Sequence, residues 1–179
     1  PCSEYMFLDD TACNLASLNL MRFFDLDSDT IAVDALVSGI RIWTMVLEIS
    51  VAMAQFPSVS IARRSYDYRT LGLGFANLGA LLMVMGVPYG SARGRAICGC
   101  LAASLTGEAY AQSARMAQEL GPYPRYEANK AAMLRVIRNH RRAAHYANPV
   151  EYEGLSIRPV AVDPGHAPQD LLSAARVAW

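Results

Sequence analysis

The sequence predicts a helix-rich α/β fold with long buried helices and few strands, and three observations support this prediction. Residues 30–55 are apolar around most of a helical circumference, which is typical of a helix buried on several sides. Residues 91–120 and 127–147 also have helical patterns, and they stop before Gly-Pro and Asn-Pro pairs. Residues 69–75 form a short run that predicts a strand, in which glycines permit a close backbone approach.

Turn-forming residues mark where the expected N-terminal elements begin and end. Residues 1–10 are expected to form a loop because they contain proline, serine and paired acids without a sustained period. Residues 11–20 fit either a buried strand or the start of a helix, since periodicity does not separate these two. Asp25–Asp29 is expected to form a turn that offers N-caps to the helix at 30–55.

The rest of the chain is divided by glycine, proline and serine. Residues 58–68 are expected to form an irregular basic connector. A helix over 76–86 should end at Gly86, and Ser91 can cap the helix that follows. Residues 149–179 are expected to form an extended tail with a short final helix from about residue 168. The length of 179 residues fits a single domain over 1–179.

Composition narrows the classes of function. Sixteen basic and sixteen acidic residues give a formal net charge of zero, which offers no whole-chain electrostatic case for nucleic acid or a membrane surface. No apolar run reaches the roughly 20 residues of a membrane span without interruption, and no signal peptide is recognisable. Hydrophobic residues make up 53% of the chain, which fits an oligomer or a piece of a larger interior. We expect a cytoplasmic protein that binds neither nucleic acid nor membrane.

The four cysteines show neither a disulfide framework nor a metal-type CxxC motif, which indicates a reducing compartment. Cys98 and Cys100 point about 200° apart on a helix, so we interpret both as packing residues. Cys2 and Glu4 lie two residues apart on the N-terminal loop, and Cys13 follows on the next element. A thiol beside a carboxylate, approached by a second thiol, supports radical, nucleophilic or redox chemistry. The spacing alone does not say which.

Several runs of residues resemble the catalytic, or large, chain of ribonucleotide reductases. The likeness begins in PCSEY at 1–5 and CNLASLNL at 13–20, and continues in RTLGLGF at 69–75 and ELGPY at 119–123. The sequences LRVIRNHRR at 134–142 and YEGLS at 152–156 are most similar to the adenosylcobalamin-dependent class, class II. The resemblance implies that this chain is a fragment of a ten-stranded α/β barrel, with a strand at 11–20.

The resemblance also implies roles for three residues. Cys2 would become a thiyl radical that removes hydrogen from the ribose 3′ carbon, after homolysis of the cobalt–carbon bond of adenosylcobalamin. Glu4 would take the 3′-hydroxyl proton as general base, and Cys13 would supply reducing equivalents. The implied partners are a ribonucleotide substrate, a dithiol reductant such as thioredoxin, the remainder of the same chain, and further copies in a homo-oligomer. The contacts of the cofactor cannot be assigned from the sequence.

Two alternatives stay open. The same three residues fit the class I large chain, whose radical arrives from a separate metal-containing subunit. The other alternative is a non-catalytic, helical, oligomerising fragment. The family's asparagine would lie one position before Pro1, and the partner thiol of Cys13 lies far upstream in the family. We therefore expect an internal fragment that is inactive alone and self-associates.

Three further patterns are weaker. Gly72 and Gly74 do not make a dinucleotide-binding motif, because Asn77 stands where a third glycine is needed. The arginines near His140 could bind phosphate, but a solvated or salt-bridged face is the favoured interpretation; they are Arg135, Arg138, Arg141 and Arg142. His140 and His145 are five apart, which does not suit a shared helical metal site, and His166 is expected to be exposed.

Overall fold

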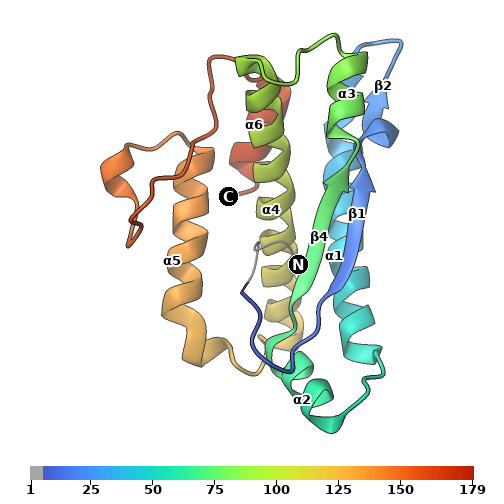
Figure 1. Ribbon diagram of the computed structural model, residues 1–179, viewed down its shortest axis with the longest axis vertical. Coiled ribbons are helices and arrows are strands. Elements are labelled where there is room, and N and C mark those ends of the chain that lie inside the picture. Colours follow the sequence, from blue (N-terminus) through green and yellow to red (C-terminus); the bar gives the residue numbers. More distant parts are fainter. Residues whose placement is uncertain (1–5) are drawn as a thin grey trace.

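A computed structural model describes residues 6–179, and Figure 1 shows its arrangement. Helices dominate, and the strands are few and short. The helices are α1 (Val33–Met53), α2 (Val59–Tyr68), α3 (Leu78–Val84), α4 (Ala92–Leu120), α5 (Tyr126–Ala144) and α6 (Gln169–Val177). The strands are β1 (Asn14–Asn19), β2 (Phe24–Asp25), β3 (Thr30–Ile31) and β4 (Leu71–Ala76), with 3₁₀ turns at Leu20–Phe23 and Pro149–Glu151.

The strands β1 and β4 form a parallel pair, in register from Asn14 opposite Leu71 to Asn19 opposite Ala76. Parallel strands need a crossover connection, and here the crossover contains α1 and α2. The helix α1 packs on one face of this pair, behind it in the view of Figure 1. Burial alternates along β1: Leu18 is buried, whereas Leu15 is 69% exposed. Among residues 6–179, the two-stranded sheet therefore has one face covered by α1 and one open face.

The turn at Asp25–Asp29 joins β2 and β3 in an antiparallel hairpin, which the sequence did not predict. Asp25 accepts the backbone N–H of Asp27 at 3.0 Å and the hydroxyl of Ser28 at 2.8 Å. These hydrogen bonds, that from Ser28 most of all, lower the pKa of Asp25. The prediction that this turn caps α1 is wrong, because the N-cap of α1 is Ala32, which makes no side-chain cap. The side chain of Asp25 stabilises the turn instead.

The long helix expected over 30–55 runs from Val33 to Met53 as α1, but it is buried on one side and not on several. The buried stripe contains Leu36, Ile40, Thr44, Leu47 and Val51. The opposite stripe is exposed and apolar, and we call it the outer α1 face; it consists of Ile42, Met45, Val46, Ile49 and Met53. These positions follow the spacing of a single helical face. The residues described here leave that face uncovered.

By length and composition α1 could cross a membrane, contrary to the expectation that no run in this sequence is long and apolar enough. Its two central charges have partners on other elements of the fold. Arg41 Nε lies 2.9 Å from Glu108 Oε2 of α4, and Glu48 pairs with Arg69, which follows α2. Those ion pairs and the buried stripe account for α1 as a packed helix of this fold.

Residues 59–68 are helical, so the prediction of an irregular connector over 58–68 is wrong. Ser58 caps α2 by accepting the N–H of Ile61 at 3.3 Å, and Arg69 ends it in a left-handed conformation with φ of 48°. The sequence of this segment shows no apolar helical face, because its one buried residue is the polar Ser65, and Arg63 and Arg64 face solvent. This correction matters for the site, since α2 contacts the segment before β1.

The core of the fold lies around α4, which packs against α1 and α6. Ser91 caps α4 by accepting the N–H of Gly94 at 3.0 Å, and Gly121 ends it, as the sequence predicts. Within α4, Gly107 permits the closest approach, because a methyl group there would lie 2.7 Å from the Cβ of Ala178. The buried centre consists of Leu36, Ile40, Leu81, Leu82, Ile97, Cys100, Leu101 and Leu171.

Candidate functional site: a cysteine on the open sheet face

Cys13 lies immediately before β1 and is half-buried. Asn14 points to the side of α1, since its Nδ2 donates to Ser50 Oγ of α1 at 2.6 Å. Neighbouring strand residues point to opposite faces, so Cys13 lies on the open face together with the exposed Leu15. The thiol donates to the carbonyl oxygen of Asn14, with Sγ and O 3.5 Å apart. Its place on the open face leaves the thiol accessible, as a reactive thiol has to be.

The segment that leads into Cys13 is attached to α2 at two points. Arg64 Nη1 donates to the carbonyl of Asp9 at 3.0 Å, and the amide of Ala12 donates to Ser65 Oγ at 3.0 Å. A tight turn lies between these points, where the amide of Thr11 donates to the carbonyl of Leu8 at 3.3 Å. The path of residues 8–12 is therefore fixed by the helix that the sequence failed to predict.

Gly72 of β4 lies beside the thiol on the same face. A methyl group at Gly72 would lie 2.9 Å from Cys13 Sγ and 2.2 Å from Leu15 Cδ2. Carbon atoms do not approach side chains that closely, so the thiol and Leu15 occupy the space that a side chain here would need. The close backbone approach expected from the glycines of 69–75 is thus found at this position.

Cys2 and Glu4, the other two predicted catalytic residues, lie outside the described residues. The structure places Cys13 alone of the three. The remaining cysteines lie elsewhere, in α4: Cys100 is fully buried and Cys98 partly buried. Burial raises the pKa of both thiols, that of Cys100 to about 11. Their thiolates are disfavoured, which agrees with their interpretation as packing residues.

The arginines of α5 make ion pairs with the segment that follows the helix. Arg138 binds Glu153 in a bidentate manner at 2.8 and 2.7 Å, and Arg142 Nη1 lies 2.6 Å from Glu153 Oε1. These bonds lower the pKa of Glu153 to about 2, with the hydrogen bond from Arg138 as the largest cause. The salt-bridged interpretation of this cluster is confirmed for Arg138 and Arg142.

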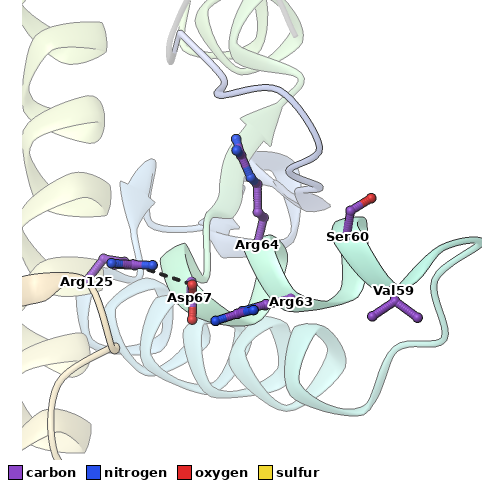
Figure 2. Close-up of a pocket in the computed structure, with 6 residues that line it drawn as sticks. All are labelled: Val59, Ser60, Arg63, Arg64, Asp67 and Arg125. Atoms are coloured by element: carbon purple, nitrogen blue, oxygen red, sulfur yellow. Dashed lines mark hydrogen bonds and ion pairs between the residues drawn. The ribbon is translucent and has the colours of Figure 1, made fainter.

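A second basic feature is a shallow hollow of about 420 Å³ on α2. Figure 2 shows Arg125 directed at Asp67, with Arg125 Nε and Asp67 Oδ2 3.3 Å apart, while Arg64 points away from them. The amide of Arg125 also donates to the carbonyl of Asp67 at 3.2 Å. This hollow therefore marks the contact between α2 and the start of α5, and we assign no ligand to it.

Comparison with known proteins identifies the family to which this chain belongs. Residues 1–158 match the family described as the barrel domain of ribonucleotide reductase, so the chain belongs to that family. A parallel strand pair with helical crossovers is the unit from which an α/β barrel is built.

Within the family, the chain is similar to vitamin B12-dependent ribonucleotide reductases. It is 59% identical to that of Agrobacterium fabrum and 58% identical to that of Bradyrhizobium diazoefficiens, over 100% of this chain and 14% of each relative. A Mycobacterium tuberculosis protein named vitamin B12-dependent ribonucleoside-diphosphate reductase is 31% identical over 78% of this chain and 20% of its own length. The chain thus spans about 14% of the length of the first two relatives.

The sequence singles out Cys13 as a candidate, but it does not indicate the residues around it. Ser65 and Ser50 carry no recognisable motif, because one hydroxyl on a helix has the same local pattern whether or not it binds a distant strand. The usable signal was Gly72, since a glycine inside a strand often marks a close approach. Which atom lies close to Gly72 depends on the register of β1 and β4, and this register could not be predicted from the sequence.

Proposed function

We propose that this chain is the part of an adenosylcobalamin-dependent ribonucleotide reductase that carries the substrate-activating cysteine and one reducing thiol. The observation that supports this most is the identity of 58–59% over the whole chain to vitamin B12-dependent reductases. The half-buried position of Cys13 on the open sheet face is consistent with a thiol that meets a partner there.

The proposed reaction reduces a ribonucleotide to a 2′-deoxyribonucleotide. A thiyl radical at Cys2 takes the hydrogen atom from the ribose 3′ carbon, while Glu4 accepts the proton of the 3′-hydroxyl. The 2′-hydroxyl takes a proton from the thiol pair and leaves as water. Cys13 and a second cysteine elsewhere in the protein supply two electrons and their second proton to the 2′ carbon and become a disulfide. Glu4 returns its proton to the 3′ oxygen and the hydrogen atom returns to the 3′ carbon. An external dithiol such as thioredoxin then reduces the disulfide.

Adenosylcobalamin would supply the radical-forming chemistry when it is bound. The side chains described in residues 6–179 do not form a recognisable site for it. His140 stacks on Trp179 with ring centroids 5.5 Å apart, and His166 Nδ1 lies 2.7 Å from Asp163 Oδ2. We therefore propose that the cofactor is held by parts of the protein beyond these residues. Such chemistry belongs in a reducing, cytoplasmic compartment.

The experiment uses the complete reductase chain that contains this segment, assayed for deoxyribonucleotide formation with adenosylcobalamin and a dithiol. We expect product that depends on the cofactor and disappears in Cys2→Ser, because the radical then has no thiol to occupy. Product that requires a metal-loaded second subunit, and not adenosylcobalamin, would favour the class I alternative. No product in either assay would contradict a reductase function.

A second candidate, a non-catalytic oligomerising fragment, is favoured by the outer α1 face. Its apolar side chains are substantially exposed, Met53 by 78% and Ile49 by 56%. Exposed apolar patches of this kind mark contacts with other chains or other parts of the same protein. We propose that the rest of the reductase covers this face, and that the 179-residue chain by itself is inactive and self-associates through it.

Sedimentation of the 179-residue chain tests this second candidate. We expect concentration-dependent oligomers that Ile49→Glu weakens, because a charge on the outer α1 face opposes its burial against another copy. Leu120→Glu is the matched control, since Leu120 is 81% exposed at the far end of α4. A monodisperse monomer would contradict self-association through this face.

A further inference from the structure

We propose that Ser65 and Gly72 are positioning residues for the Cys13 thiol. Together with Ser50 they form what we call the Cys13 seat. The inference rests on the proposed function in one respect, that Cys13 is a reducing thiol. The placement of the thiol by the seat can be measured without any turnover.

The first contact of the seat is made by Ser65. This residue of α2 is 1% exposed, and its Oγ accepts the amide of Ala12 at 3.0 Å across 53 residues of sequence. Ala12 precedes Cys13 directly, so fixing its amide fixes the peptide plane that leads to the Cys13 backbone. An amide in such a part-buried position needs a partner, and Ser65 provides it.

The second contact fixes the residue on the other side of Cys13. Asn14 Nδ2 donates to Ser50 Oγ of α1 at 2.6 Å. The two neighbours of Cys13 are thus tied to two different helices, Ala12 to α2 and Asn14 to α1. A rotation of the chain that would turn the thiol away from the open face has to break at least one of these bonds.

The third part of the seat is the space above Gly72. A side chain at that position would meet Cys13 Sγ at 2.9 Å, whereas one at Gly74 would meet Ser17 Oγ at 3.6 Å, an ordinary contact. The two glycines lie in the same strand, two residues apart, and therefore on the same face. They differ in what fills the space above them: at Gly72 it is the Cys13 thiol together with Leu15 Cδ2, which a methyl group would meet at 2.2 Å, and neither of these atoms lies near Gly74.

The seat matters because disulfide formation is demanding in geometry. The two Cβ atoms must come to about 3.5–4.5 Å with a narrow range of dihedral angles. A displacement of about 1 Å at a reacting group can slow a reaction by about 100-fold. Hydrogen bonds hold both neighbours of Cys13, and the thiol lies in the space above Gly72. The thiol is therefore preorganised to meet its partner without sampling other rotamers and backbone positions.

The test uses the complete reductase chain with Ser65→Ala or Gly72→Ala, each with a matched control. Ser104→Ala removes another serine that is 1% exposed within a helix, but one whose hydroxyl has no hydrogen-bond partner among the described residues. Gly74→Ala adds the same methyl group as Gly72→Ala, without contact to the thiol. Thermal melting confirms that each variant is folded.

Two quantities are measured. The first is the rate at which iodoacetamide alkylates Cys13, followed by mass spectrometry of the peptide and recorded from pH 7 to 10. The second is kcat and KM with a dithiol. We expect Ser65→Ala and Gly72→Ala to change the alkylation rate severalfold and to lower kcat by about 10- to 100-fold, with KM changed by less than about twofold. Ser104→Ala should leave all these quantities unchanged, and Gly74→Ala should leave the alkylation rate unchanged.

Unchanged alkylation of Cys13 in both Ser65→Ala and Gly72→Ala would overturn the seat, whatever the activity. Equal effects of Gly72→Ala and Gly74→Ala would also overturn it. Failure of the proposed function has a different signature: full dithiol-dependent turnover in Cys13→Ala would remove the reducing role, while the alkylation rates would still report whether the seat exists.

Discussion

The α4 region and the β1–β4 sheet differ in how far other elements of the chain cover them. The helix α4 is surrounded: α1 and α6 pack on it, and Trp179 donates from Nε1 to the carbonyl of Ala103 at 3.0 Å. The sheet is covered by α1 on one face and open on the other, where Cys13 lies. The described residues therefore form one region whose apolar side chains are largely covered and one region with an uncovered sheet face.

The difference predicts unequal sensitivity to the loss of apolar side chains. Leu101 of α4 is 1% exposed, so Leu101→Ala should lower the free energy of unfolding by about 2–5 kcal/mol, because it leaves a cavity. Leu15→Ala removes the same atoms from the open face, where Leu15 is 69% exposed, and should cost less than about 1 kcal/mol. Urea denaturation of both variants measures the contrast, and equal losses would contradict it.

The next effect concerns the ion pair that connects α1 to the α4 region. Arg41→Met leaves the carboxylate of Glu108, whose side chain is 6% exposed, without its partner. We expect a loss of about 2 kcal/mol in the free energy of unfolding, less than for a fully buried pair because the Arg41 side chain is 41% exposed. The double variant with Glu108→Gln should recover part of this loss, and a loss as large as in the single variant would contradict the assignment.

A smaller, local effect is expected where Glu153 binds α5. The side chain of Asn139 donates to the carbonyl of Glu153 and accepts its amide, both at 2.9 Å, while two arginines hold the carboxylate. Glu153→Gln removes the charge, and hydrogen exchange of residues 150–156 should become faster while α4 is unaffected. Unaltered exchange in this segment would show that Asn139 suffices.

The pH dependence of this contact has a definite sign. The pKa of Glu153 is lowered to about 2 in the folded chain, against about 4.3 for a free glutamate. Its contribution is therefore fully present above about pH 4.3 and is lost as the pH falls toward about 2. Glu153→Gln should remove this part of the acid sensitivity of hydrogen exchange.

The smallest effect is expected at His140, which stacks on Trp179 with an interplanar angle of 3°. Desolvation of the ring lowers the pKa of His140, so the unfolded chain binds this proton more readily. Stability should rise as the pH rises toward about 6.5 and level off above it, and the gain should be small because much of the residue stays exposed. Thermal melting from pH 5 to 8 should show this slope, and His140→Gln should flatten it.

Most of the helical architecture could be predicted from the sequence, because its signals are local. Ser91 and Gly121 mark the ends of α4 through their own side chain and backbone. The helix α2 was missed for an equally local reason: its arginines gave it the pattern of a polar connector, and its single buried residue, Ser65, has no apolar side chain. Tertiary contacts decide such a segment, and propensity does not.

The site could be predicted in part, and through resemblance more than through physics. Cys13 is a candidate because its neighbours match a family motif, while the spacing of thiols and acids leaves several chemistries open. Its surroundings depend on the parallel register that sets Gly72 opposite Leu15, and on a bond between Ala12 and Ser65. Contacts across 53 residues are properties of the folded chain and leave no local pattern.

That same 53-residue separation has a consequence for the order of folding. The helices α1 and α2 are local structures that form quickly, whereas pairing of β1 with β4 must first close the long loop that contains both. The surroundings of Cys13 are therefore completed late. A nascent or refolding chain therefore lacks the neighbours that half-bury the Cys13 thiol until β4 pairs with β1, and this thiol is more open to oxidants during synthesis than in the folded chain.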